Sequence, residues 1–219
     1  MKIPLSPRLQ MCAGFVRPGD RVADIGCDHG YLGIHLLKEG IARSMIEADI
    51  NEGPLQSALR NTHKYGVADK TSFYLSDGAK NIPRDFDAMI CAGMGADTMI
   101  HILEDAQWLK DPKYRLILQC QSKTPMLRRY LSDNGWRIRS ESVLRDGKFL
   151  YTVMEVCFDP NHPRLTDGEC YFPPALLEYS SNALSEYYDR IVQGLRLAVC
   201  HKNDAEKKAI LEELEKLEL

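Results

Sequence analysis

Short apolar runs alternate with helical patterns through the first two thirds of the chain, and this alternation constrains the fold more than any other feature. Helical patterns separate the apolar runs; residues 53–65, for example, have Pro54 near the start and Gly66 after the end. The runs predict strands at residues 21–25, 44–49, 71–75, 87–91 and 115–119. Strands and helices in alternation favour a parallel sheet covered by helices on both faces.

Two more extended runs close this part of the chain. Residues 136–144 and 149–158 are joined by Arg-Asp-Gly-Lys at 145–148, which is typical of a hairpin. They bring the sheet to seven strands and add an antiparallel strand. The sequence therefore predicts an α/β domain over residues 1–158, with a doubly wound, mostly parallel, Rossmann-like sheet.

The pattern changes after residue 158. Residues 159–174 are rich in Pro, Asp and Gly and are interpreted as a linker. Two helices with apolar stripes follow, and residues 201–204 are the expected turn between them. The stripes are Leu177, Leu184, Ile191 and Ala198 on the first helix, and Ile210, Leu214 and Leu217 on the second. Residues 159–219 are thus predicted to be a linker and a C-terminal helical hairpin, similar to a short coiled coil.

Composition narrows the functional classes. Residues 159–219 hold seven Lys and Arg against twelve Asp and Glu, and residues 1–158 hold 21 against 19, so the net charges are −5 and +2. We therefore expect a polyanionic partner to contact residues 1–158 rather than residues 159–219. The seven cysteines include no C-x-x-C pair, which predicts reduced, buried thiols and no metal site. The first 15 residues hold no long apolar run, so we expect a cytoplasmic protein without a signal peptide or membrane span.

Small or acidic residues follow four of the predicted strands, where ligands of open α/β sheets bind. Asp49 lies 25 residues after Asp24, close to the spacing that places a carboxylate on ribose hydroxyls. Asp77 could accept from an adenine amino group. The candidate cofactor residues are Asp24, Gly26, Asp28, His29, Asp49, Ile50, Asp77, Gly78, Ala92, Gly93 and Met94. Together they predict a nucleoside pocket.

Asp28 indicates which nucleoside ligand this pocket takes. A pyrophosphate needs bare backbone N–H groups, and a carboxylate in the loop would repel it. Asp28 therefore argues against NAD and ATP, and the chain has no G-K-[ST] motif. S-adenosylmethionine fits better, because it combines adenosine with a sulfonium and an ammonium and carries no phosphate; S-adenosylhomocysteine would be the product.

These residues resemble a known family. The chain is similar to the bacterial tRNA (adenine-N1)-methyltransferases known as TrmK, within the class I methyltransferases. The similar stretches are LSPRL (5–9), ADIGCDHGYL (23–32), ADINEGPLQSA (48–58), SDGA (76–79), AGMG (92–95), LILQ (116–119) and GWRIRSES (135–142). Cys120 and Gln121 depart from the Pro-Asn usual in the family. The resemblance implies methylation of N1 of adenine 22 in the D-arm of tRNA, with no obligate protein partner inferred.

Methylation of N1 needs alignment and stabilisation of a developing cation rather than a strong base. Asp28 is the first catalytic candidate and Asp97 is the second. Each has an alternative role: Asp28 could hold the sulfonium ligand or cap the next helix, and Asp97 could be a helix cap. His29 could order the cofactor carboxylate or face the base. Tyr31 could stack on a flipped adenine or pack in the core.

Candidate acceptor contacts complete the sequence interpretation. Gln119 could hydrogen-bond the base edge or simply end its strand, and Arg8 could pair with the cofactor carboxylate or a phosphate. Arg128, Arg129 and Arg137 are predicted phosphate contacts, with solvated surface charge as the alternative. The resemblance implies that the helical hairpin assists tRNA binding through Arg190, Arg196 and Lys202. Two other functions stay open: methylation of a protein or small molecule, and a non-catalytic scaffold that binds S-adenosylmethionine.

Overall fold

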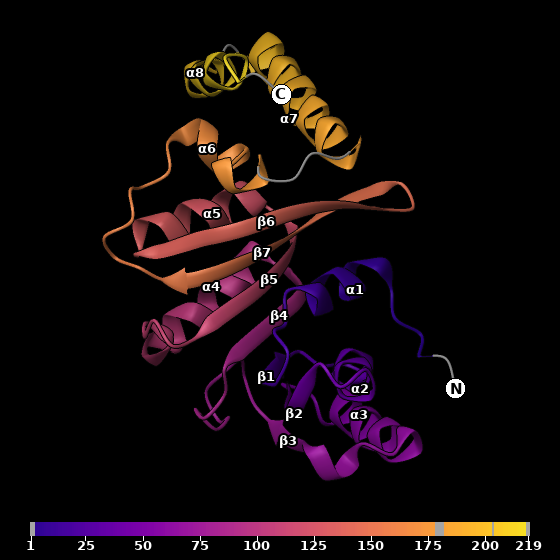
Figure 1. Cartoon of the computed structure of the whole chain (residues 1–219). Helices are drawn as coiled ribbons and strands as arrows, with labels where there is room; N and C mark the ends of the chain where they lie inside the picture. The colour runs from indigo at the N-terminus through magenta and orange to yellow at the C-terminus, as the bar shows by residue number, and fades with distance from the viewer. Residues whose placement is uncertain (1–2, 178–181, 203, 218–219) are drawn as a thin grey trace.

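A seven-stranded sheet in the order β3-β2-β1-β4-β5-β7-β6 forms the centre of the molecule (Figure 1). The computed structural model describes residues 3–177, 182–202 and 204–217. β1 to β5 run parallel, whereas β7 lies antiparallel between β5 and β6. The strands are β1 (Asp20–Ile25), β2 (Ala42–Asp49), β3 (Thr71–Leu75), β4 (Ala88–Gly95), β5 (Arg115–Ser122), β6 (Trp136–Asp146) and β7 (Phe149–Phe158). This order confirms the predicted Rossmann-like, mostly parallel sheet.

The helices are α1 (Pro7–Gly14), α2 (Tyr31–Lys38), α3 (Glu52–Tyr65), α4 (Ala96–Asp105), α5 (Thr124–Asp133), α6 (Asp167–Tyr171), α7 (Asn182–Lys202) and α8 (Ala205–Leu214). Of these, α2, α3 and α4 connect successive parallel strands as predicted, whereas no helix lies between β3 and β4. β4 continues beyond its predicted end at Cys91, because Met94 and Gly95 still pair with Cys120 and Ser122 of β5. The AGMG segment is therefore the end of a strand rather than a free loop.

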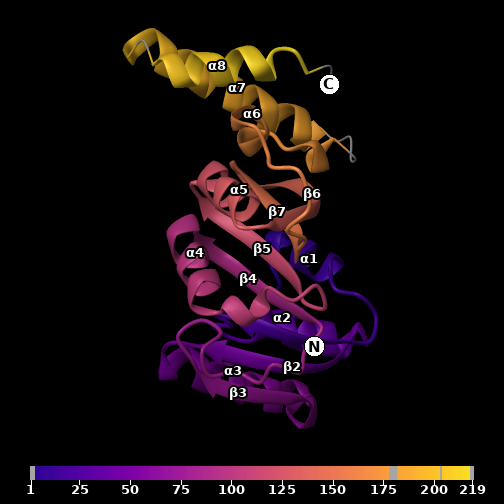
Figure 2. The same ribbon diagram turned by 90° about the vertical axis from the view of Figure 1, so that its left-hand side faces the viewer.

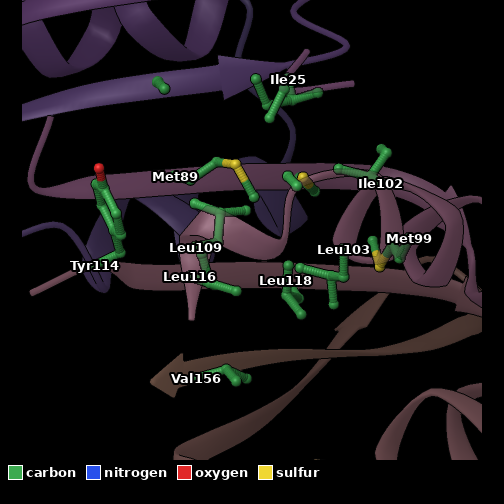
Figure 3. Close-up of a cluster of buried hydrophobic side chains, with 14 of the residues drawn as sticks. Ile25, Met89, Met99, Ile102, Leu103, Leu109, Tyr114, Leu116, Leu118 and Val156 are labelled. Carbon is green, nitrogen blue, oxygen red and sulfur yellow. The ribbon is translucent and has the colours of Figure 1, made fainter. Parts of the chain in front are cut away.

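Alternate residues of the central strands point into two separate cores. On one face, α1 and α2 cover residues such as Val22 and Ile90. On the other, α4 and α5 cover Met89, Leu116 and their neighbours (Figure 3). All seven cysteines are free thiols, and six of them are buried as predicted, whereas Cys200 is exposed. Both faces of the sheet are thus buried, as the continuous apolar strands require.

The segment expected to be a linker is more ordered than its composition suggested. Residues 167–171 form α6, which begins with a capping box: Thr166 Oγ1 accepts from the Glu169 N–H, and Glu169 accepts from the Thr166 N–H. Phe172 and Leu176, which follow, are each 1% exposed. Apolar burial and a local cap therefore offset the cost of ordering this Pro-rich stretch.

α7 and α8 pack together over this segment. Leu184, Leu195, Ile210 and Leu214 are buried in one cluster with Phe172, which confirms the predicted pair of helices. In Figures 1 and 2, they lie at the opposite end of the molecule from β3. α7 runs to residue 202, further than predicted, and Leu177 lies before it. Within the described ranges, no helix is long and apolar enough to cross a membrane.

Candidate active site

The loop between β1 and α2 folds back over the end of β2. Gly26 and Cys27 donate their backbone N–H groups to Ala48 O at 2.8 and 3.0 Å. Gly26 has a φ of 76°, and a Cβ there would overlap with Met94 Cε at the end of β4. Asp28 has a φ of 51°, a conformation that aspartate tolerates better than most residues. The sequence thus fixes a tight loop that carries a carboxylate at its tip.

A cavity of about 240 Å³ lies between this loop, α1 and the end of β4. Its lining residues are Arg8, Leu9, Asp24, Gly26, Cys27, Asp28, His29, Tyr31, Leu32, Ala92 and Gly93. The structure therefore brings the predicted cofactor residues of β1 and β4 together with two predicted acceptor contacts, Arg8 and Tyr31. They meet at the carboxyl end of the parallel strands, where open α/β sheets bind their ligands.

Asp49 ends β2 beside this cavity, and two backbone N–H groups fix its carboxylate. Oδ1 accepts from the Asn51 N–H at 2.9 Å, and Oδ2 accepts from the Asp28 N–H at 3.3 Å. The remaining lone pairs suit the two hydroxyls of a ribose. The next residue, Ile50, is 61% exposed although it is large and apolar. Such a side chain next to a carboxylate that is predicted to bind ribose suits the face of a purine.

Asp77 and Gly78 follow β3. Asp77 Oδ2 accepts from Lys80 Nζ at 2.6 Å, whereas its Oδ1 has no hydrogen bond to the described residues. That oxygen is available to an amino group. Gly78 has a φ of 57°, and a Cβ there would lie 2.9 Å from Ile102 Cγ1, so glycine is required by both backbone and packing.

One group of side chains in the described ranges has metal-ligand geometry. Asp77, His101 and Asp105 place one ligand atom each within 4.8 Å of the others. All three are exposed, and Lys80 Nζ contacts both carboxylates, at 2.6 and 2.8 Å. The ammonium already pairs with both carboxylates, so we assign no metal to this cluster.

Two carboxyl groups lie side by side in the core beneath the cavity. Asp24 and Glu47 are register partners in the β1–β2 pair and are 4% and 0% exposed. Burial, together with the nearby Asp49 carboxylate, raises the pKa of Asp24 to about 7. Burial, with Asp24 as its neighbour, raises the pKa of Glu47 well above its usual value.

Glu47 is a residue of this site that the sequence interpretation missed. Neither of its carboxyl oxygens has a hydrogen-bond partner in the described part of the chain. Gly33 of α2 makes room for it, because a Cβ at Gly33 would overlap with Glu47 Oε1. The signal was present: Glu47 precedes Asp49 by two positions, and side chains two apart on a strand share a face.

Gln119 joins β5 to the cavity wall. Its Oε1 accepts from the Gly93 N–H at 3.0 Å and from Arg8 Nη1 at 2.9 Å. The side chain is 0% exposed, so the prediction that Gln119 contacts a base edge is wrong. It positions Arg8 and Gly93 instead, and Gly93 must remain glycine because a Cβ would lie 3.1 Å from Arg8 Nη1.

The two catalytic candidates lie in different surroundings. The Asp28 side chain is 70% exposed and lines the cavity. Its Oδ1 is 3.7 Å from His29 Nε2, beyond hydrogen-bond range. Asp97 lies in the first turn of α4, where it accepts from Lys123 Nζ at 2.9 Å, and the N-cap of that helix is Gly95 rather than Asp97. The geometry therefore favours Asp28 over Asp97 as the carboxylate that meets a ligand.

His29 and Tyr31 combine a packing role with access to the cavity. Their ring centroids are 5.9 Å apart, and Tyr31 also meets Tyr65 edge-on at 6.5 Å. Tyr31 is half-buried against the α1–α2 core and still lines the cavity. Stacking on a base therefore stays a prediction for Tyr31, as cofactor binding does for His29.

The predicted basic cluster does not form one surface. Arg128 is 0% exposed and pairs with Glu141, so the prediction that it binds a tRNA phosphate is wrong; burial makes it unreachable. Arg129 is exposed and pairs with Asp167 at 2.6 Å. Arg137 is also exposed. Phosphate binding by these last two stays a prediction.

The arginines of the helical hairpin are exposed and have acidic neighbours. Arg190 donates to Glu186 at 2.8 Å and to Lys148 O at 3.2 Å. Arg196 donates to Glu215 at 2.6 Å. The side chain of Lys202 lies outside the described residues. Exposed pairs of this kind are weak, so these arginines could exchange partners with a phosphate.

Comparison with known proteins identifies the family. Residues 5–154 match the methyltransferase domain family. A relative from Bacillus subtilis, a tRNA (adenine(22)-N(1))-methyltransferase, is 33% identical over 154 residues, which are 70% of this chain and 65% of the relative.

Solved structures extend the similarity over nearly the whole chain. The Streptococcus pneumoniae protein Sp1610 in complex with S-adenosyl-L-methionine is 29% identical, with a TM-score of 0.84 over 96% of this chain and 99% of that one. The B. subtilis m1A22 tRNA methyltransferase TrmK is 27% identical, with a TM-score of 0.80 over 98% and 95%. The chain therefore belongs to the methyltransferase domain family, and over nearly its whole length it is similar in structure to TrmK.

Proposed function

We propose that this chain transfers a methyl group from S-adenosylmethionine to N1 of adenine 22 in the D-arm of tRNA. The observation that supports S-adenosylmethionine as the cofactor is that the backbone N–H groups of the loop between β1 and α2 already make hydrogen bonds within the protein. Those of Gly26 and Cys27 donate to Ala48 O, and that of Asp28 donates to the Asp49 carboxylate. A pyrophosphate would find no free donor among these three groups and would meet the exposed Asp28 carboxylate.

The residues at the strand ends fit each part of S-adenosylmethionine. Asp49 suits the ribose hydroxyls, and the open Oδ1 of Asp77 suits the adenine amino group. Arg8 lies in the cavity wall, where it suits the methionine carboxylate. Asp24, when ionised, suits the ammonium. The cavity therefore matches a cationic nucleoside with a free amino-acid end.

Methyl transfer to adenine N1 requires little from the protein beyond the correct placement of the base and the methyl group. When bound, S-adenosylmethionine supplies an electrophilic methyl group. Neutral adenine already has a lone pair at N1, so the chain must align it and stabilise the positive charge that develops on the ring. Asp28 is placed for this role, because its carboxylate makes no hydrogen bond to the described residues. Tyr31 is placed to stack on a base that has left its helix.

The acceptor class rests on the relatives rather than on the cofactor half of the fold, because that half is common to many methyltransferases. The similarity to B. subtilis TrmK extends over 98% of this chain and therefore takes in α7 and α8 as well as the sheet. This similarity supports the same acceptor, tRNA, for both proteins. A tRNA substrate makes the cytoplasm the expected compartment.

The test is transfer of labelled methyl from S-adenosylmethionine to unmodified tRNA transcripts that carry adenine or guanine at position 22. We expect label on the first transcript and none on the second. Nuclease digestion of the product then identifies N1-methyladenosine. Label on neither transcript, with cofactor binding measured separately, would overturn the tRNA assignment and favour a protein or small-molecule acceptor.

A further inference from the structure

A second cavity, of about 320 Å³, lies between the start of β6 and the segment that follows β7. We refer to it as the β6 cavity. Its lining residues are Ser132, Trp136, Arg137, Ile138, Arg139, His162, Pro163, Arg164, Leu165, Glu169, Pro173, Pro174 and Ala175. None of these residues lines the cofactor cavity.

The β6 cavity and the cofactor cavity lie at opposite ends of the parallel strands. Trp136 at the start of β6 pairs with Phe158 at the end of β7, and the preceding residue of β7, Cys157, pairs with Arg115 at the start of β5. This is the amino end of the parallel strands. In Figure 1, the chain that leaves β7 toward α6 passes on this side. A ligand in the β6 cavity would therefore not compete with the cofactor.

Four basic side chains line this cavity, and the ion pairs that its arginines make with acidic residues are long or absent from the described ranges. Arg137 and Arg164 each have a carboxylate oxygen at 3.6 Å, from Asp159 and Asp133, which is too long for a hydrogen bond. The structure gives Arg139 no hydrogen bond or ion pair within the described ranges. The fourth is His162, which is half-buried. By contrast, other exposed arginines, such as 129 and 196, bond to carboxylates at 2.6 Å.

The one carboxylate in the cavity wall is already engaged. Glu169 Oε2 accepts from the Thr166 N–H at 2.8 Å within the capping box of α6. The three guanidinium groups therefore outweigh the wall's single negative charge. Asp159 and Asp133 lie outside the wall and contact two of these arginines only at 3.6 Å, so an anion between the guanidinium groups would relieve their mutual repulsion.

The cavity is built from fixed backbone rather than from a loose loop. The Asp159 N–H donates to Gly135 O at 2.9 Å, and the Leu165 N–H donates to Ser132 Oγ at 2.7 Å. Prolines at 163, 173 and 174 stiffen the opposite wall. The β6–β7 register shifts between Ile138 and Ser140, so Arg139 lies at a bulge, a feature that re-aims a side chain.

We propose that the β6 cavity binds a phosphate group. Guanidinium groups match the geometry of phosphate oxygens, and several of them around one site favour an anion of high charge density. The phosphate could belong to the backbone of an RNA or to a phosphorylated small molecule. The proposal is independent of the methyl transfer proposed above, since the cofactor cavity takes no part in it.

The test compares the full-length chain with two charge-matched double variants. Arg137→Gln/Arg139→Gln removes two positive charges from the cavity. Arg60→Gln/Lys64→Gln removes two exposed charges from α3, at the other end of the sheet. The probe is inorganic phosphate, and the readout is the indole N–H signal of Trp136 in a ¹⁵N spectrum. The chain has only two tryptophans, so a Trp108→Phe variant assigns that signal.

We expect a saturable shift of the Trp136 signal in the wild type and in the α3 variant. In the cavity variant, we expect phosphate affinity to fall at least about tenfold, for two lost charge-assisted contacts. A shift that never saturates, or that is the same in both double variants, would overturn the proposal. Methyl transfer is not measured, so failure here is separable from failure of the proposed enzyme activity.

Binding of a tRNA transcript at several salt concentrations distinguishes the two sources of the phosphate. If RNA supplies it, the cavity variant should bind tRNA more weakly than the α3 variant, and its slope of log affinity against log salt should be smaller by about 2. If tRNA affinity is equal in both variants while phosphate binding is lost only in the cavity variant, the ligand is a phosphorylated small molecule.

Discussion

Arg128 on α5 and Glu141 on β6 form a two-bond ion pair in which both side chains are 0% exposed. Arg128 Nε donates to Glu141 Oε2 at 3.1 Å, and Nη2 donates to Oε1 at 2.7 Å. The same guanidinium donates to Tyr171 O at 2.8 Å and to the Tyr187 hydroxyl at 3.2 Å. One arginine thus ties the sheet domain to α6 and α7.

Replacing Arg128 should therefore damage the fold rather than RNA binding alone. Arg128→Met leaves the Glu141 carboxylate buried without its partner, and we expect the free energy of unfolding to fall by about 3–5 kcal/mol. Urea denaturation measures this. Arg129→Met is the matched control, because its exposed pair should contribute less than about 1 kcal/mol. Wild-type stability with reduced tRNA affinity in Arg128→Met would restore the role that the sequence predicted.

The contact between Gly33 and Glu47 gives a prediction about packing. Gly33→Ala should destabilise the protein by about 1–3 kcal/mol, because the added methyl overlaps with the Glu47 carboxyl group. Glu47→Ala makes room for that methyl, so the double variant should be more stable than the sum of the single changes implies. A double-mutant cycle of unfolding free energies measures the coupling. Strict additivity would show that the methyl is accommodated in another way.

Because Asp24 is buried, we expect the stability of the protein to depend on pH. Its pKa in the folded protein, about 7, is higher than its ordinary value of 3.8, so the folded state holds the proton more tightly. The stability that this contributes is fully present below pH 3.8 and is lost as the pH rises toward 7. Asp24→Asn cannot ionise, so we expect it to be more stable than wild type at pH 8. Thermal or urea unfolding across this range measures the difference.

Ionisation of Asp24, which lowers the stability of the fold, should strengthen cofactor binding. Ionised Asp24 suits the cofactor ammonium, so wild-type affinity for S-adenosylmethionine should rise between pH 5.5 and 7.5. Asp24→Asn should bind more weakly at pH 7.5 and show less pH dependence. Calorimetric titration at both pH values tests this. Equal pH dependence in the two proteins would assign the titration to another group.

The sheet could be predicted because its signals are local. Each buried strand shows as a short apolar run, and chain reversals carry Gly or Pro, so the mostly parallel sheet follows from the alternation of strands and helices. The position of β7 between β5 and β6 does not follow from this pattern. The candidate ligand residues Asp49 and Gly93 could be proposed for the same reason, since each lies at or just after the end of a predicted strand. The extension of β4 to Gly95 was not visible, because it depends on pairing with Ser122 of a distant strand.

The roles of the polar residues could not be predicted to the same degree. Arg128 and Arg129 are adjacent and chemically identical, yet the first is buried and the second is exposed. What separates them is the side of α5 on which each lies and the position of Glu141. Gln119 was a candidate for base recognition, with the end of a strand as the alternative. Its burial and its hydrogen bond to Arg8, which is 111 residues away, are not visible in the sequence. Such assignments need the tertiary contacts.

The last prediction separates the two catalytic candidates. Asp28→Asn keeps the shape of the side chain, and asparagine also tolerates positive φ, so the loop should keep its conformation and unfolding should match wild type. If the Asp28 carboxylate stabilises the charge that develops on adenine, kcat at saturating S-adenosylmethionine should fall about 100-fold.

Asp97→Asn serves as the matched control for Asp28→Asn. It removes the same charge from a residue that pairs with Lys123 and does not line the cofactor cavity, so its kcat should stay close to wild type. Both variants are measured with unmodified tRNA at saturating cofactor. Full activity in Asp28→Asn would show that this carboxylate only shapes the loop or holds the cofactor. A large loss in Asp97→Asn would instead move the charge-stabilising role to the start of α4.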